Sequence, residues 1–183
     1  MAAFPPPGFG LELLNRNHRR RQFSSGDARI DGWLVHKALT AMEKHTSTTR
    51  VLVRADGALA GFYTLASTAL DVSLVPAALF AGQPPRRAPP TLTLAWLGVE
   101  RSFTGQGFGT KLFARALADG VAVYDLVRFV AVIIDALTEE NISFCRDQGF
   151  MLVPGTTHKL YLPATTLLQI VSSRTGWTPP ERA

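Results

Sequence analysis

Glycine occupies every second position of one short segment, Gly105-Gln106-Gly107-Phe108-Gly109. Because glycine has no Cβ atom, such a segment lets the backbone approach a ligand closely. An amphipathic helical pattern follows at once, and the first turn of a helix presents free N–H groups that bind phosphate. The spacing therefore predicts a loop that holds a phosphorylated ligand.

Two familiar phosphate loops make demands that this segment does not meet. A nucleoside-triphosphate loop needs Gly-Lys followed by Ser or Thr, whereas Gly109 is followed by Thr110 and then Lys111. A dinucleotide loop needs the spacing G-x-G-x-x-G, and here the spacing is G-x-G-x-G. A plain turn is the remaining alternative, and the elements predicted around the loop weigh against it.

These elements follow from hydrophobic patterning. An apolar strand is predicted over residues 91–99, a helix over 110–124 and a continuously apolar strand over 129–134. This order is typical of two parallel strands joined by a right-handed crossover. The buried stripe of the helix is predicted to consist of Leu112, Phe113, Ala116, Leu117 and Val121.

The rest of the chain alternates strands and helices. Before the loop we expect a strand over 11–14, a helix over 30–44 capped by Asp27, and a hairpin of strands 50–54 and 59–69. A proline-bounded surface insertion at 76–90 is expected to contain a short helix at 77–80. After the loop we expect a helix over 139–148, strands over 150–153 and 158–162, and a helix over 165–170. The fold class is therefore α/β (α+β).

Length and composition limit the class of protein. The 183 residues suit one domain, and 46% hydrophobic with 18% charged residues indicates a folded chain. A single cysteine, Cys145, excludes a disulfide framework, and the 4 histidines show no ligand-pair spacing, so no metal is expected. The N-terminus does not resemble a secretory signal, and no apolar run is long enough to span a membrane. We therefore expect a cytoplasmic enzyme.

The chain is basic, with a net charge of +5 and a pI near 9.9. A basic surface attracts phosphate-rich partners, which could be a nucleotide cofactor or a nucleic acid, and a merely solvated basic face is the alternative. No zinc finger, aromatic RNA-binding pattern or helix-turn-helix signature is visible. The basic residues gather in three places: Arg16, His18, Arg19, Arg20 and Arg21; Lys37 and Lys44; and Arg86 and Arg87.

The loop resembles the pyrophosphate loop of the GCN5-related N-acetyltransferases (GNAT), written Gln/Arg-x-x-Gly-x-Gly/Ala. Gly107 and Gly109 match its small positions, and Thr104 stands where Gln or Arg is usual. A wider series is similar to the tRNA-acetylating toxins of type II toxin–antitoxin pairs. That series comprises Gln22-Phe23-Ser24-Ser25-Gly26, Ile30-Asp31-Gly32-Trp33-Leu34, Gly61-Phe62-Tyr63-Thr64-Leu65-Ala66-Ser67, Leu97-Gly98-Val99-Glu100-Arg101-Ser102, Ala136-Leu137-Thr138-Glu139-Glu140 and Gly149-Phe150.

The resemblance implies a single GNAT-like domain over residues 11–170, with 1–10 and 171–183 as flexible tails. It implies a mixed sheet of about six to seven strands with flanking helices and a splayed central parallel strand pair. Acetyl-CoA would be the cosubstrate, its pantetheine arm lying along the strand that ends at Val99. The residues implied in its binding are Leu97, Gly98, Val99, Thr104, Gly105, Gln106, Gly107, Phe108, Gly109, Thr110, Asn141 and Phe144.

Catalysis requires an oxyanion donor and a proton for the departing thiolate. The resemblance assigns the first role to the backbone N–H of Val99. In the family a tyrosine usually attends the thiolate, and Cys145 occupies that position here. A thiol can donate a proton, but its side chain is shorter, and the alternative interpretation, which we favour, is that Cys145 is a small helix residue packed near the cofactor. Tyr63 and Tyr161 are alternative donors, and Ser67 is a candidate substrate contact.

Three functions are compatible with these residues. The first is a toxin that acetylates the amino group of aminoacyl-tRNA, which the ordered motifs and the basic pI favour. The second is a GNAT enzyme acting on a small amine or a protein amine. The third is a weakly active or inactive acetyl-CoA-binding protein, suggested by Cys145 and Thr104. The toxin resemblance also implies a ribbon-helix-helix antitoxin as partner and a possible homodimer.

Overall fold

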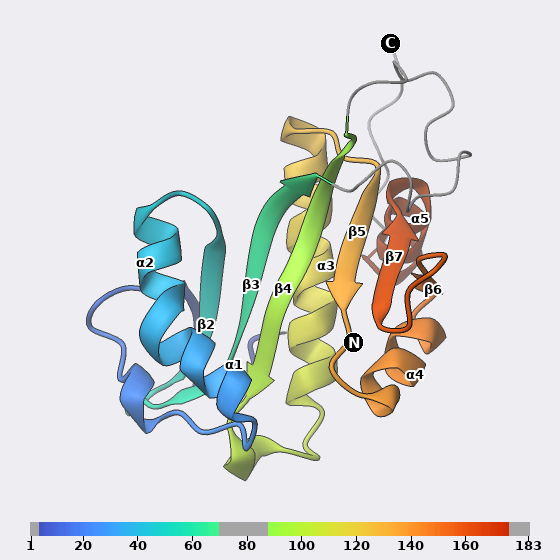
Figure 1. Cartoon of the computed structure of the whole chain (residues 1–183). Coiled ribbons are helices and arrows are strands. Elements are labelled where there is room, and N and C mark those ends of the chain that lie inside the picture. The colour runs from blue at the N-terminus through green and yellow to red at the C-terminus, as the bar shows by residue number, and fades with distance from the viewer. Residues whose placement is uncertain (1–3, 70–87, 176–183) are drawn as a thin grey trace. The chain divides into compact units, whose positions relative to one another are not determined.

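Seven strands hydrogen-bond in the order β1-β2-β3-β4-β5-β7-β6 in the computed structural model, which describes residues 4–69 and 88–175 (Figure 1). The β4–β5 pair is parallel, whereas β1–β2, β2–β3, β5–β7 and β6–β7 are antiparallel. The predicted mixed sheet with a central parallel pair is therefore confirmed. The strands are β1 (Phe9–Leu13), β2 (Thr48–Arg54), β3 (Leu59–Ala69), β4 (Pro90–Val99), β5 (Ala131–Asp135), β6 (Met151–Leu152) and β7 (Lys159–Pro163).

The helices lie close to the predicted positions. They are α1 (Ala28–Gly32), α2 (Ala38–Glu43), α3 (Phe108–Leu126), α4 (Glu139–Asp147) and α5 (Ala164–Thr175). Most of the insertion predicted at 76–90, including its short helix at 77–80, Arg86 and Arg87, lies outside the described residues, as do the outermost parts of the two predicted tails, 1–3 and 176–183.

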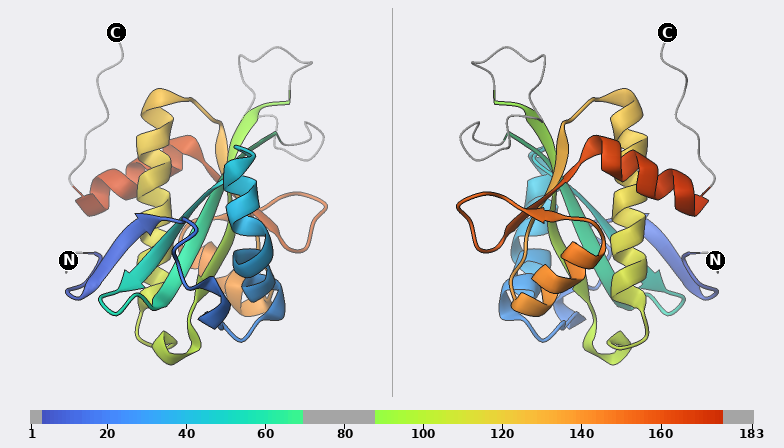
Figure 2. Two further views of the ribbon diagram at one scale, coloured as in Figure 1. Left: turned by 90° about the vertical axis from the view of Figure 1, so that its left-hand side faces the viewer. Right: turned by 90° about the vertical axis from the view of Figure 1, so that its right-hand side faces the viewer.

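The chain divides into two compact units, of which the first comprises residues 1–66 and 94–116. In it β1 and β2 pair so that Leu11 faces Leu52, and β2 continues into the β3 hairpin through the predicted turn at Asp56 and Gly57. Helices α1 and α2 lie along one face of these strands (Figure 2). The core between them is formed by Leu14, Phe23, Leu34, Ala38, Val51, Leu59 and Phe62.

The helix predicted over residues 30–44 is interrupted. Asp27 caps its start as predicted, since its side chain accepts a hydrogen bond from the Arg29 N–H at 2.8 Å. Between α1 and α2, however, Trp33–Lys37 form a π-helical turn in which the Ala38 N–H bonds to Trp33 O. Apolar spacing detects a helical face but not an extra residue in one turn, so the prediction of a single regular helix was wrong here.

The second unit comprises residues 67–93 and 117–183. Within the described residues, the parallel ladder joins Thr91, Leu92 and Thr93 to Ala131, Val132 and Ile133, although β4 continues to Val99 and β5 to Asp135. On its other edge β5 pairs with β7, and α5 packs against these two strands. The predicted apolar stripe of α3 is confirmed, because Leu112, Phe113, Ala116, Leu117 and Val121 are all buried.

Candidate active site

The glycine loop leads from β4 into α3 in the first unit, and two of its glycines are required by the backbone. Gly105 has φ +79° and Gly107 has φ +77°, a conformation that other residues adopt only at a cost. A Cβ atom at either position would meet no atom within 4 Å, so the requirement is conformational. Gly109 lies in the first turn of α3 without a positive φ, and a Cβ there would lie 3.6 Å from Val99 Cγ2. Its small size is therefore not needed by the fold.

The start of α3 presents unpaired backbone donors. The first hydrogen bond of the helix runs from Lys111 N to Gly107 O at 3.1 Å, so the amides of Phe108, Gly109 and Thr110 precede it. Thr104 and residues 105–107 are exposed beside them. An exposed helix start of this kind is suited to a phosphate group.

A short turn before the loop fixes its position. Residues Arg101–Phe103 form a 3₁₀ turn, capped by Glu100 Oε2, which accepts from the Ser102 N–H at 2.8 Å. The Gln106 side chain donates from Nε2 to Ser102 O at 2.9 Å. Gln106 thus closes the loop on this turn through its side chain and through its backbone N–H, which donates to Phe103 O at 3.4 Å.

Three aromatic rings pack together at the base of the glycine loop. The ring centroids of Phe9 and Phe103 are 5.7 Å apart, and Phe108 lies 5.3 Å from each of them. Phe108 is buried in this trio, so its predicted part in ligand binding is limited to its backbone amide. Lys111 Nζ lies 5.8 Å from the Phe108 centroid and adds a positive charge to the first turns of the helix.

The end of β4 carries Leu97, Gly98 and Val99, and it is tightly held. The Glu100 N–H bonds to Ala60 O and the Arg101 N–H to Ser24 O, both at 2.9 Å. Ser25, next to Ser24, donates from N and Oγ to Asp31 Oδ1 at 2.8 and 2.6 Å. The Phe-Ser-Ser-Gly motif therefore connects helix α1 with the strand end that leads into the glycine loop.

The predicted catalytic cysteine lies in the second unit, on α4. Thr138 caps this helix by accepting a hydrogen bond from the Asn141 N–H at 3.2 Å, and the Asn141 side chain is exposed. Phe144 is half-buried, and Cys145 is only 4% exposed. Burial raises the pKa of the Cys145 thiol to about 11. The thiol therefore keeps its proton at neutral pH, which disfavours a role as a nucleophile.

The other candidates named from the sequence have different surroundings. Tyr63 is 1% exposed and Tyr161 is 8% exposed, and the Tyr161 hydroxyl lies 3.9 Å from Met151 Sδ. Ser67 is exposed near the end of β3. Both tyrosines thus pack as core aromatic residues.

The predicted arginine cluster is only partly free. Arg16 forms an ion pair with Glu43 at 2.6 Å, and Arg20 donates to Val35 O at 3.2 Å. Arg19 and Arg21 are exposed. Two of the four arginines are thus engaged within the first unit, and two present their side chains to solvent.

A pair of tryptophans was not anticipated from the sequence. Trp33 and Trp96 stack with centroids 5.2 Å apart and ring planes at 12°. Trp33 Nε1 donates to Thr64 Oγ1 at 3.1 Å, and that hydroxyl lies 2.8 Å from Thr49 Oγ1. Sequence patterning placed Trp33 on a helix face, but no spacing rule connects it with Trp96.

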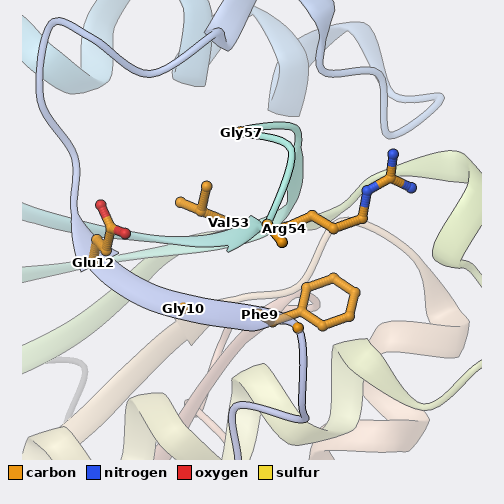
Figure 3. Close-up of a pocket in the computed structure, with 8 residues that line it drawn as sticks. Phe9, Gly10, Glu12, Val53, Arg54 and Gly57 are labelled. Atoms are coloured by element: carbon orange, nitrogen blue, oxygen red, sulfur yellow. The ribbon is translucent and has the colours of Figure 1, made fainter.

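A shallow hollow of about 420 Å³ lies on the antiparallel pair β1–β2 of the first unit (Figure 3). Phe9 and Arg54 lie at one end of it and Glu12 at the other. It contains none of the site residues predicted from the sequence.

Neither a metal centre nor a membrane segment is found in the described part of the chain. Across residues 4–69 and 88–175, no three His, Cys, Asp or Glu side chains gather as metal ligands. In the same ranges, no helix is both long and apolar enough to cross a membrane.

Comparison with known proteins identifies the class to which the strand, glycine loop and helix belong. The chain belongs to the acetyltransferase (GNAT) family, whose model matches residues 12–150. A tRNA-acetylating toxin of Mycobacterium tuberculosis is 31% identical over 135 residues, which cover 72% of this chain and 78% of that protein. The predicted family and the predicted acetyltransferase activity are thereby confirmed.

Solved structures show the same fold. AtaT complexed with acetyl-methionyl-tRNAfMet has a TM-score of 0.76 at 22% identity, covering 87% of this chain and 96% of that chain. A tyrosine-to-phenylalanine variant of the toxin AtaT, bound to the C-terminus of the antitoxin AtaR and acetyl-CoA, has a TM-score of 0.74 at 21% identity. That match covers 89% of this chain and 98% of AtaT. These likenesses confirm the predicted GNAT-like fold.

Proposed function

We propose that this protein is a toxin that transfers the acetyl group of acetyl-CoA to the amino group of aminoacyl-tRNA and so blocks translation. The observation that carries the proposal is the glycine loop between β4 and α3, with its left-handed Gly105 and Gly107 and the unpaired amides of α3. Membership of the acetyltransferase family makes acetyl-CoA the natural ligand of this loop. Similarity to a tRNA-acetylating toxin supports the acceptor.

The proposed cofactor site has three parts. The pyrophosphate accepts hydrogen bonds from backbone amides of the loop and of the first turn of α3, since a helix start favours anions. The pantetheine arm lies along the backbone of Leu97, Gly98 and Val99, where β4 continues beyond its ladder with β5. Asn141 and Phe144 of α4 are the residues of the second unit that the family resemblance assigns to acetyl-CoA. The loop contributes Thr104, Gly105, Gln106, Gly107, Phe108, Gly109 and Thr110.

The chemistry is attack of a neutral amine on the thioester carbon. The C–N bond forms, the C–S bond breaks, and the thiolate leaves with the electron pair. The Val99 N–H donates a hydrogen bond to the carbonyl oxygen as negative charge develops on it. The amine loses a proton to water, the thiolate gains one from the Cys145 thiol, and the Cys145 thiolate then takes a proton from water, which restores the enzyme.

The biological setting follows from the relatives. The toxin AtaT binds the antitoxin AtaR, and we propose a ribbon-helix-helix antitoxin as the partner of this chain. Because tRNA is the proposed acceptor, we propose a cytoplasmic location, and a homodimer is the proposed assembly. The exposed Arg19 and Arg21 offer positive charge for RNA.

The test is incubation of the full chain with labelled acetyl-CoA and total tRNA, either charged or deacylated. Label on charged tRNA alone supports the proposal. Label on small amines or protein amines instead would assign another acceptor. If no acceptor is labelled, the variant Cys145→Tyr distinguishes a wrong substrate from a weak enzyme, because only a weak enzyme lacking the family's tyrosine gains activity from it.

A further inference from the structure

The stacked pair Trp33 and Trp96 presents a fixed carbon surface in the first unit. Both rings are half-buried, and their planes are nearly parallel. The indole N–H of Trp33 is engaged by Thr64, whose hydroxyl is in turn paired with the buried Thr49. The Trp33 ring therefore cannot rotate without breaking this chain, and its polar atom is not available to a ligand.

The pair lies on the opposite side of β4 from the phosphate-binding helix. Successive side chains of a strand point to opposite faces. Trp96 therefore shares a face with Gly98, which contacts Ile30 of α1, whereas Val99 Cγ2 faces Gly109 of α3. Helix α3 occupies one face at the end of β4, and on the other face, beside α1, the two tryptophans pack on the core and leave part of their rings accessible to an acceptor.

The backbone is adapted to this arrangement. The π-helical turn begins at Trp33, and an extra residue in a turn rotates the flanking residues by about 100° relative to one another. Leu34 and Ala38 are both fully buried in the core, while Trp33 is turned towards β4. Single π turns inside helices occur frequently at functional sites. The π-helical turn therefore begins at Trp33, the residue that stacks on Trp96.

We infer that Trp33 and Trp96 form the wall that receives the side chain of the aminoacyl group and that they select apolar and aromatic amino acids. The inference rests on the proposed function. With the thioester carbonyl beside the backbone of Leu97 and Val99, the side chain of the aminoacyl group would lie against Trp96, the residue before Leu97. An aromatic surface without a free donor binds apolar groups and leaves polar ones without hydrogen bonds.

The test compares acceptors that differ only in the amino acid. A single tRNA sequence is aminoacylated in separate reactions with phenylalanine, leucine, glycine or serine by a ribozyme that accepts all four amino acids. For each charged tRNA, kcat/KM for acetyl transfer is then measured. The full-length protein should prefer phenylalanine and leucine over glycine and serine by about 10-fold or more, the range that an apolar pocket provides. In Trp96→Ala this preference should fall by about 10-fold, and Trp96→Phe should largely restore it.

Tyr124→Ala is the matched control, because Tyr124 is also a half-buried member of an aromatic pair, 5.3 Å from Phe129 on the second unit. It should leave the preference unchanged. If kcat/KM falls equally for all acceptors in Trp96→Ala, or if the wild type prefers glycine or serine, the inference is wrong but the proposed function stands. If the wild type transfers acetyl to none of the charged tRNAs, both the proposed function and the inference are wrong. If Trp96→Ala does not fold, Trp96→Leu retains apolar volume without the ring and serves in its place.

Discussion

Gly98 packs directly against Ile30: a Cβ atom added to Gly98 would lie 2.6 Å from Ile30 Cγ2, and 2.8 Å from Phe62 Cε1. Gly61 on the neighbouring strand is equally close to its surroundings, since a Cβ there would lie 2.6 Å from Leu112 Cδ1. Because Gly98 and Gly61 have no side chains, α1 and α3 can pack closely against the end of β4 and the neighbouring strand. The backbone at the end of β4, which carries the proposed oxyanion donor, has little freedom to move.

Gly98→Ala should destabilise the protein by about 1–3 kcal/mol, because a new methyl group would force Ile30 and Phe62 out of their packing. Urea denaturation measures the loss. Gly32→Ala is the matched control, since a Cβ at Gly32 would meet no atom within 4 Å and its φ of −61° is helical. That variant should be as stable as the wild type or more stable by up to about 1 kcal/mol. Equal stability of Gly98→Ala and the wild type would contradict the packing described.

Gly107→Ala should weaken acetyl-CoA binding, because its φ of +77° costs an alanine about 1–2 kcal/mol and the loop would relax to another shape. Titration calorimetry with acetyl-CoA measures the affinity. Gly155 has the same φ of +77° and equally open surroundings, so Gly155→Ala carries the same backbone cost away from the loop. Both variants should lose similar stability, and only Gly107→Ala should lose affinity. Loss of affinity in both would assign the effect to general destabilisation.

The phosphate loop and its flanking elements could be predicted from the sequence because they depend on local rules. Alternate glycines, an apolar strand before them and a 3.6-residue stripe after them each determine local backbone shape, and Leu112 and Val121 are buried as expected. The start of α3 was placed two residues late because Phe108 and Gly109 had been read as loop. The first residue of a helix is hard to predict from sequence. Here Gly109 lies in the first turn although glycine has a low helix propensity.

Other features depend on contacts between distant parts of the chain. The stack of Trp33 on Trp96 and the π-helical turn that begins at Trp33 both arise from packing of a helix on a strand far along the sequence. Periodicity reports only which residues share a face, so it cannot detect them. Similarly, glycine has a low strand propensity, and the reason for Gly98 becomes clear only from the structure, in which Ile30 occupies the space that a side chain at position 98 would need.

Asp27→Ala should reduce stability at neutral pH by about 1 kcal/mol, because Asp27 accepts a hydrogen bond from the Arg29 N–H at the start of α1. Asp27→Asn retains an acceptor for the Arg29 N–H but lacks the charge that pairs with the Arg29 side chain, so it should lose part of that stability. The side-chain hydrogen bond from Arg29, with its backbone N–H, lowers the pKa of Asp27 to about 2. A lowered pKa contributes stability above the unfolded value of 3.8 that disappears as the pH falls through 2. Denaturation from pH 5 to 2 should therefore show the gap between wild type and Asp27→Asn closing.

Cys145 should make stability depend on alkaline pH, because burial raises its pKa from 9.0 to about 11. A raised pKa leaves stability intact below the unfolded value and removes it as the pH rises through the folded value. The loss between pH 9 and 11 should be roughly 2 kcal/mol, given 1.36 kcal/mol for each pKa unit. Because lysines and tyrosines titrate in the same range, the measurement is the difference between wild type and Cys145→Ala. A constant difference across that range would show that the thiol is not desolvated.

The activity of Cys145 variants distinguishes an acid from a packing residue. If the thiol protonates the departing coenzyme A, Cys145→Ala should lower kcat by about 10²-fold or more while the KM for acetyl-CoA changes little. Since the thiol is protonated up to about pH 11, its ionisation should cause no loss of wild-type activity between pH 7 and 9. If Cys145 only fills space, Cys145→Ala should keep its kcat and lose about 1 kcal/mol of stability, the cost of a small cavity. Steady-state kinetics and urea denaturation on the same preparations decide between the two, because the first role moves kcat and the second moves the midpoint of unfolding.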